Sequence, residues 1–194
     1  MKKHFILASS SPRRQALLQQ VHIPFTVRKP DVDESQVIES DPEEKVEQLA
    51  RLKGLATTLS NESEVILSAD TVVAYKNKIF GKPKSEQDAL QMLSLLSGSV
   101  HDVYTGVMLR SAHKEEIFVE KTKVEFWPLS NAEINSYIAT DEPYDKAGAY
   151  GIQSAGAMFV KQIIGDYFTV VGLPISRVCR ELKYFSIQPD VSEF

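Results

Sequence analysis

Short apolar runs alternate along the chain with segments in which apolar residues recur every three or four positions. The apolar runs predict strands at residues 4–8, 64–75, 101–110 and 116–127. The segments with helical periodicity predict helices at residues 12–21, 42–59, 86–97, 131–139 and 174–185. Strands and helices in alternation are typical of the α/β class, here with a mixed sheet.

Residues at the segment ends support these boundaries. Each of the first four helices follows a residue whose side chain can cap it: Ser11, Asp41, Ser85 and Ser130. Four further stretches are predicted to turn or to be irregular: the loops 29–36 and 141–156, a turn at 76–78 that leads into a short return strand, and a hairpin at 165–166.

The composition is that of an ordinary soluble chain, with 194 residues, 43% hydrophobic, and a formal net charge of -4. This length allows one domain or two small lobes, the second built from residues near 30–60 or 130–180. The single cysteine, Cys179, excludes an internal disulfide and fits a cytoplasmic location. We expect no signal peptide and no membrane span. The mild acidity argues against a general nucleic-acid coat.

Two arginines stand in the first turn of the helix that follows Ser11. A helix N-terminus carries partial positive charge and unpaired N–H groups, so it favours anions, and Arg13 and Arg14 oppose it. Either an anion neutralises this cluster, or both arginines point into water or pair with carboxylates elsewhere. The stretch is neither GxxxxGK[ST] nor GxGxxG, so neither common nucleotide motif accounts for it.

Two charged residues interrupt apolar patterns. Asp70 separates the runs 65–67 and 72–73, so its carboxylate lies inside or at the end of a core strand. It either caps a loop or serves as a general base or metal ligand, and we favour the second reading. Lys53 lies on the apolar stripe of its helix, which also carries Val46 and Ala56, and either snorkels to the edge or binds an anion in a cleft.

Other candidates depend on where the fold places them. Glu34, like Asp33, is in a polar loop and would matter only if brought to Asp70, where paired carboxylates could hold Mg²⁺. Lys82, in the letters GKP, reads by itself as a surface lysine in a turn.

The glycine-rich segment 145–153 mixes groups that can contact a nucleotide. Lys146 offers charge, and Tyr150 and Gln153 can stack on a base or hydrogen-bond to it. The alternative is a plain glycine-rich loop. The four histidines show no metal-ligand spacing, and we assign no chemistry to them or to Cys179.

Taken together, six motifs resemble, in order, those of the Maf family of nucleotide pyrophosphatases: LASSSPRRQALL, the helix with Lys53, SADT, GKP, DEPYDKAGAYGIQ and GDYFTVVGLP. The resemblance implies one domain over residues 1–194 with an α/β fold similar to that of inosine triphosphate pyrophosphatases. This fold has a long mixed sheet with flanking helices and two lobes around a deep cleft. The implied activity is hydrolysis of nucleoside triphosphates to the monophosphate and pyrophosphate with Mg²⁺ or Mn²⁺, and a homodimer is compatible with the family.

Within the family, three positions match the subgroup that acts on dTTP and UTP. Arg13 directly follows the proline, Thr71 follows Asp70, and Gln153 ends KAGAYGIQ. The subgroup acting on 7-methyl-GTP instead has Trp after the proline and Gln after the aspartate. By this match, Asp70 accepts a proton, and Arg13, Thr71 and Gln153 set substrate preference.

The resemblance also implies a phosphate path and a catalytic set. The path is expected to be lined by Ser9, Arg14, Lys53, Lys82 and Lys146. Lys53 and Lys82 would act with Asp70 and Glu34 in catalysis, and these two carboxylates would hold the metal. One departure is Ser68, where the family usually has glycine, which bears on the packing of the strand more than on catalysis.

A non-enzymatic regulator is the alternative function. It would bind a nucleotide or a cell-division protein, in keeping with the family's older association with septum formation. Such a protein would keep the phosphate site but would not need the carboxylate of Asp70.

Overall fold

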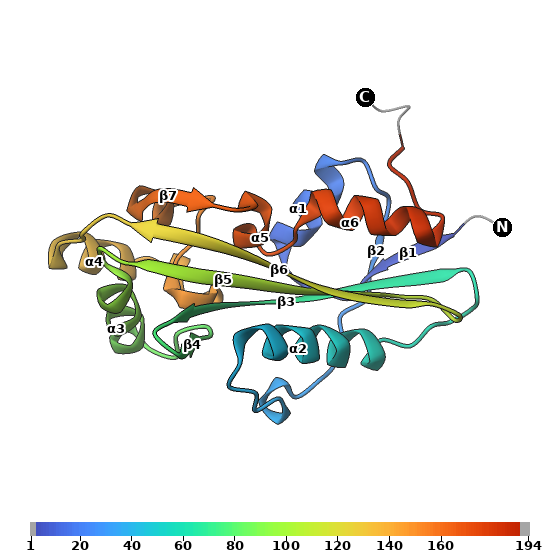
Figure 1. Cartoon of the computed structure of the whole chain (residues 1–194), viewed down its shortest axis with the longest axis horizontal. Coiled ribbons are helices and arrows are strands. Elements are labelled where there is room, and N and C mark those ends of the chain that lie inside the picture. Colours follow the sequence, from blue (N-terminus) through green and yellow to red (C-terminus); the bar gives the residue numbers. More distant parts are fainter. Residues whose placement is uncertain (1–2, 191–194) are drawn as a thin grey trace.

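The computed structural model describes residues 3–190 as an α/β fold around one seven-stranded mixed sheet (Figure 1). The strands are β1 (His4–Leu7), β2 (Thr26–Val27), β3 (Glu64–Tyr75), β4 (Lys78–Phe80), β5 (Val100–Arg110), β6 (Glu115–Phe126) and β7 (Val160–Ile164). Their order is β2-β1-β3-β5-β6-β7, and β4 pairs with β3 beside this path. The predicted fold class is confirmed.

Five of the six helices that the structure describes lie close to their predicted positions. The helices are α1 (Pro12–Gln20), α2 (Pro42–Ala56), α3 (Glu86–Leu96), α4 (Asn131–Ile138), α5 (Tyr167–Val171) and α6 (Ile175–Leu182). The exception, α5, lies directly after the predicted hairpin, where no helix was expected. Five short 3-10 helices join them: η1 (Glu34–Gln36), η2 (Glu142–Asp145), η3 (Ala147–Ala149), η4 (Ala155–Phe159) and η5 (Lys183–Phe185). Within residues 3–190, no helix combines the length and the apolar character that a membrane crossing requires.

The cleft opens at a gap along one edge of β3. The first part of this strand pairs in parallel with β1, up to Leu7 opposite Leu67. Its last part pairs with β4, from Val73 opposite Phe80 onward. Between these partners, in the described part of the chain, residues 68–72 have no strand on this side, whereas β5 continues along the other side.

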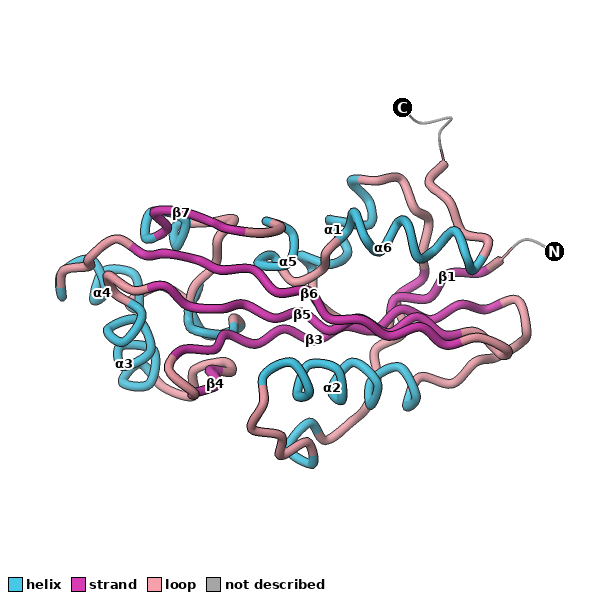
Figure 2. The backbone as a smooth tube through the Cα atoms, in the orientation of Figure 1, coloured by secondary structure: helices cyan, strands magenta, loops and turns pink. Residues whose placement is uncertain are grey.

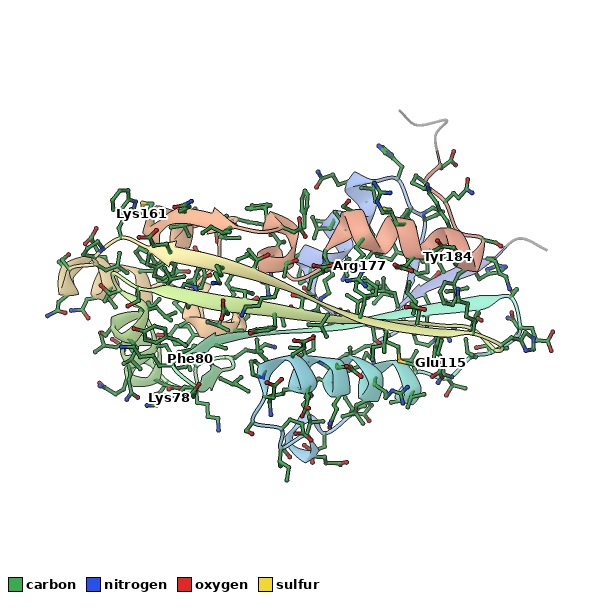
Figure 3. The ribbon with its side chains drawn as sticks, in the orientation of Figure 1. Lys78, Phe80, Glu115, Lys161, Arg177 and Tyr184 are labelled. Atoms are coloured by element: carbon green, nitrogen blue, oxygen red, sulfur yellow. The ribbon has the colours of Figure 1, made fainter. Side chains whose placement is uncertain are left out.

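Helices cover both faces of the sheet and one of its ends. Figures 1 and 2 show α2 on one face, with α1, α5 and α6 on the opposite face and α3 and α4 at the far end of the long strands. Arg177 of α6 lies against β6 (Figure 3), where its guanidinium binds Glu120 at 2.7 Å and stacks 4.2 Å from the centre of the Phe118 ring. These contacts hold α6 against that face of the sheet.

The α2 helix packs unusually close to the sheet. A Cβ atom at Gly106 of β5 would lie only 2.4 Å from the backbone oxygen of Val46, so the position requires glycine. Val46 packs there with Val72 and Tyr104 in a small apolar cluster. This close approach brings side chains of α2 within reach of the middle of β3.

Three details of the sequence prediction are wrong. No hairpin forms at residues 165–166, because Gly165, with φ of +128°, turns the chain out of β7 and Asp166 caps α5 through the amides of Phe168 and Thr169. On α2, Ala56 is exposed rather than on the buried stripe, since the helix ends there. The loop 29–36 is also not wholly irregular, because Asp33 caps η1.

Ser68 fits the close contact between β3 and α2. Its side chain is fully buried, and its hydroxyl donates a 2.7 Å hydrogen bond to the Ala50 carbonyl oxygen. Gly54 leaves room for this hydroxyl, since a Cβ there would lie 2.7 Å from it. The departure from the family's usual glycine is therefore accommodated by a hydrogen bond.

Replacing Ser68 with alanine is expected to lower the free energy of unfolding by about 1 kcal/mol, because one buried hydrogen bond is lost. Urea denaturation measures this change. The matched control is Ser94→Ala on the exposed side of α3, which should change stability by no more than a few tenths of a kcal/mol. Equal stability of the two variants would contradict the prediction.

Candidate active site

The gap in the sheet edge is the floor of a cleft with a volume of about 1150 Å³. Its walls come from the β1–α1 turn, the loop before α2, α2 itself, the middle of β3, the turn after β4, the segment 145–154 and residues 170–172. All the site residues expected from the sequence line it: Ser9, Arg13, Arg14, Glu34, Lys53, Asp70, Thr71, Lys82, Lys146 and Gln153. Their chemical roles remain predictions.

A buried lysine joins two carboxylates in the middle of the cleft. Lys53 is 9% exposed, and its ammonium binds Asp70 Oδ1 on β3 and Glu34 Oε1 on η1, the latter at 3.0 Å. It therefore does not snorkel to solvent. A buried ammonium is stable only when paired, so this contact explains why a lysine is tolerated on the apolar stripe of α2.

Arg14 is held by neutral oxygen atoms. Its Nε donates to the Gly172 carbonyl at 2.8 Å, and its two terminal nitrogens donate to the hydroxyls of Ser9 at 3.3 Å and Thr71 at 3.2 Å. Desolvation lowers the pKa of Arg14, and the nearby charge of Asp70 opposes this shift. The guanidinium is thus fixed in the cleft with its charge uncompensated by a direct carboxylate contact among the described residues.

Hydroxyl groups extend this support into the sheet. Thr71 and Thr105 lie opposite each other on β3 and β5, and their hydroxyls are 2.8 Å apart. Thr105 is fully buried and donates to the backbone oxygen of Thr169, in α5, at 2.9 Å. Sequence reasoning missed Thr105, although its position in the alternating strand 101–110 could have signalled an inward hydroxyl.

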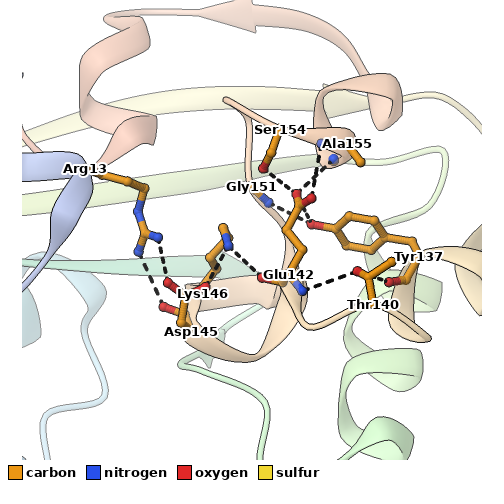
Figure 4. Close-up of polar contacts among 10 residues, drawn as sticks. Arg13, Tyr137, Thr140, Glu142, Asp145, Lys146, Gly151, Ser154 and Ala155 are labelled. Carbon is orange, nitrogen blue, oxygen red and sulfur yellow. Dashed lines mark hydrogen bonds and ion pairs between the residues drawn. The ribbon is translucent and has the colours of Figure 1, made fainter. Parts of the chain in front are cut away.

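Arg13 forms an ion pair across the mouth of the cleft (Figure 4). Its Nη1 binds Asp145 Oδ2 at 2.7 Å, and Lys146 Nζ binds the other oxygen of the same carboxylate at 2.6 Å. Burial raises the pKa of Asp145, but Lys146 and Arg13 together outweigh this effect and hold it below its usual range. Of the two alternatives given for the arginines, Arg13 therefore takes the one in which it pairs with a carboxylate elsewhere in the chain. Asp145 is a second residue that sequence reasoning missed.

A second carboxylate, Glu142, shapes the turn that carries Gln153 (Figure 4). It accepts hydrogen bonds from the Tyr137 hydroxyl at 2.7 Å, the Ser154 hydroxyl at 2.5 Å, and the amides of residues 155 and 156 at 3.2 Å each. Gln153 and Lys82 are both exposed on the lining of the cleft, and Gly81, next to Lys82, accepts a hydrogen bond from the amide of Gly148 at 3.1 Å. No local pattern singles out Glu142, because its hydrogen-bond partners lie up to 14 residues away.

Tyr150 forms the back of this wall and faces the core with its hydroxyl. It is 5% exposed, and its hydroxyl lies 2.9 Å from Nε2 of buried His101. The His101 Nδ1 is also buried and has no hydrogen-bond partner within the described residues. Desolvation lowers the pKa of His101 to about 4, so the imidazole is neutral near pH 7.

The donor set suits a divalent cation only in part. Within residues 3–190, no three His, Cys, Asp or Glu side chains are grouped to hold a metal ion. The carboxylates of Asp70 and Glu34 do lie close together, because both bind the Lys53 ammonium. Mg²⁺ often binds through one or two carboxylates and completes its shell with water and substrate phosphates, so this pair fits that mode.

Comparison with known proteins decides the family. Residues 4–185 match the family described as Maf-like protein. The chain belongs to the Maf family. Two curated relatives are named dTTP/UTP pyrophosphatase. The one from Halalkalibacterium halodurans is 52% identical over 181 residues, which cover 93% of this chain and 95% of the relative. The one from Bacillus cytotoxicus is 52% identical over 183 residues, which cover 94% of this chain and 96% of the relative.

The fold has a distant structural relative. A HAM1 protein from Coxiella burnetii superimposes with a TM-score of 0.51 at 12% identity, covering 94% of this chain and 99% of that chain. At this identity the likeness concerns the fold alone. It agrees with the long mixed sheet and two lobes expected for the Maf family.

The lowered pKa of His101 predicts a pH dependence of stability. Below its unfolded pKa near 6.5, the unfolded chain binds a proton that the folded protein does not bind until about pH 4. The free energy of unfolding should therefore fall by up to about 3 kcal/mol as the pH drops through this window. Urea denaturation between pH 7 and pH 4 measures this loss of stability. The His101→Gln variant should lack it, so its free energy of unfolding should fall less steeply as the pH drops. An unchanged slope in that variant would contradict the prediction.

Proposed function

We propose that this Maf protein is a nucleoside triphosphate pyrophosphatase that hydrolyses dTTP and UTP to the monophosphate and pyrophosphate. The observation that carries the proposal is the arrangement in one cleft of a carboxylate on the central strand, Asp70, and the fixed, uncompensated guanidinium of Arg14. The names of the relatives, at 52% identity over nearly the whole chain, support the same substrates.

The cations of the cleft bind the triphosphate. Arg14 is already oriented by three neutral acceptors, so little conformational freedom is lost when a phosphate joins it. Lys82 and Lys146 approach from the rim and from the segment 145–154. Charge accumulates on the leaving pyrophosphate as the bond between the α- and β-phosphates breaks, and these cations stabilise it.

Asp70 activates the attacking water. A water molecule attacks the α-phosphorus, the bond to the bridging oxygen breaks, and Asp70 accepts the proton of the water. Lys53 holds the Asp70 carboxylate in place, because its ammonium binds one carboxylate oxygen and leaves the other for the water.

Asp70 and Glu34 are the residues that would hold Mg²⁺ or Mn²⁺. The ion would neutralise phosphate charge and lower the pKa of bound water. The Glu34 side chain is 56% exposed, and its carboxylate lies beside that of Asp70 because both bind the Lys53 ammonium.

Base selection falls to three residues around the cleft. Gln153 presents an amide, which both donates and accepts hydrogen bonds and so matches the edge of a pyrimidine. Thr71 adjoins the Arg14 guanidinium, and Arg13 stands at the mouth. Glu142 acts through Gln153, because it fixes the turn on which that amide lies.

Pyrophosphate release from a panel of canonical and modified nucleotides, with Mg²⁺ or Mn²⁺ and with a chelator, tests the function. We expect the highest kcat/KM for dTTP and UTP and loss of turnover with the chelator. Nucleotide binding without any release would instead support the non-enzymatic regulator and sink the proposal.

Asp70→Asn is expected to lower kcat by about 10²- to 10⁴-fold, because the amide cannot accept the proton. Steady-state kinetics and a thermal melt measure activity and folding together. The matched control is Asp102→Asn on neighbouring β5, whose carboxylate binds Lys121 at 2.9 Å outside the cleft and should leave kcat near the wild-type value. Near-normal turnover by folded Asp70→Asn protein would refute the assignment of the base.

Gln153→Glu is expected to weaken the preference for pyrimidines, because a carboxylate loses the N–H donor of the amide. The measured quantity is the ratio of kcat/KM for dTTP to that for GTP, which should fall by about tenfold or more. Gln153→Asn keeps the amide on a shorter side chain. It therefore separates the loss of the N–H donor from the loss of reach toward the base. An unchanged ratio in Gln153→Glu would show that another residue reads the base.

A further inference from the structure

We propose that Asp145 determines how tightly the cleft binds polyphosphates, by acting as a latch. In the free protein its carboxylate holds Arg13 and Lys146 across the mouth of the cleft, and a polyphosphate must take these cations from it. We call this set of three residues the Asp145 latch. The proposal deepens the proposed function and rests on it.

The latch connects the two walls of the cleft. Arg13 is in the first turn of α1, and Asp145, 132 residues later, ends η2. Arg13 Nη1 binds Asp145 Oδ2 at 2.7 Å, and Nη2 also contacts the Asp145 backbone oxygen at 3.4 Å. Lys146 Nζ binds Oδ1 at 2.6 Å and the Glu142 backbone oxygen at 2.6 Å.

The carboxylate occupies the place that a phosphate would take between these cations. Each of its two oxygens receives one cation, as the oxygens of a bound phosphate group would. Two other cations of the cleft differ: among the described residues Arg14 contacts neutral oxygens, and Lys53 is enclosed with Asp70. A ligand can therefore bind Arg13 and Lys146 only by competing with the Asp145 carboxylate at the cleft mouth.

The latch is weak enough for a ligand to open. The side chain of Asp145 is 56% exposed and that of Arg13 is 29% exposed, so water screens their attraction. An anion with a single charge gains little by replacing Asp145, whereas a triphosphate offers several charged oxygens to both cations at once. The latch thus favours ligands with several phosphates.

A double-mutant cycle separates the latch from plain repulsion between Asp145 and an anionic ligand. Titration calorimetry at low ionic strength gives Kd for α,β-methylene dTTP and for inorganic tripolyphosphate with wild type, Asp145→Asn, Arg13→Gln and the double variant. We expect Asp145→Asn to bind both probes about three- to tenfold tighter than wild type. In the Arg13→Gln background the same change should tighten binding by less than about twofold, because no Arg13 ion pair remains to be broken.

Three results would overturn the latch. An equal gain in both backgrounds would mean simple repulsion, which does not depend on Arg13. Weaker binding by Asp145→Asn would mean that Asp145 orients Arg13 and Lys146 for the ligand instead of competing with it. Failure of both probes to bind any of the four proteins would mean that these cations do not form a polyphosphate site.

Asp141→Asn is the matched control. This exposed residue precedes η2, does not cap it through its side chain, and carries the same charge as Asp145. If Asp141→Asn tightened binding of the probes as much as Asp145→Asn does, the effect would come from net charge alone. That result would also overturn the latch.

Failure of the proposed function would look different. If wild-type protein releases no pyrophosphate from any nucleotide, the enzymatic proposal fails. The cycle with tripolyphosphate still decides on the latch, because this probe has no base and needs no catalysis.

Discussion

The site depends on one buried charge contact, in which Lys53 joins Asp70 and Glu34. The ammonium sits on the apolar side of α2 and is stable there only because a carboxylate of the central strand meets it. The contact requires α2 to lie close to the sheet, which Gly106 makes sterically feasible. It also anchors the loop that carries Glu34, so one lysine fixes a helix, a strand and a loop around the reacting centre.

Four cations of the cleft fall into three electrostatic states. Lys53 is neutralised by carboxylates inside the protein, Arg14 is oriented by neutral acceptors, and Arg13 shares a solvent-exposed carboxylate with Lys146. These states differ in how much a ligand gains by contact with each cation. A guanidinium held by neutral atoms is ready for a phosphate, whereas one held by a carboxylate must first exchange partners.

The sequence was sufficient for the elements that depend on local physics. Strand β3 has the predicted limits, and Ser130 caps α4 as predicted, in a capping box with Glu133. The error at residues 165–166 arose because glycine followed by aspartate is typical of a hairpin turn, whereas an aspartate can also begin a helix. In the structure Asp166 caps α5, and its backbone oxygen accepts a hydrogen bond from Thr122, 44 residues earlier in the chain.

The candidate site was predictable where a residue violates its own local pattern. Lys53 and Asp70 are charges in apolar surroundings, and they drew attention for that reason. Asp145 is an ordinary aspartate in a polar loop, and the pattern around Thr105 signals at most a hydroxyl at an inward strand position. Their importance comes from partners in other elements, such as Arg13, 132 residues away, which no local pattern encodes.

The gap along β3 has a consequence for the evolution of this fold. The cleft exists because β1 ends opposite Leu67 and β4 begins opposite Val73. Extending either short strand by a residue or two would cover part of this edge and narrow the opening, without altering β5, β6 or the core beneath them. A change in the length of β1 or β4 could thus change the size of the cleft while the middle of β3, which carries Asp70, keeps its geometry.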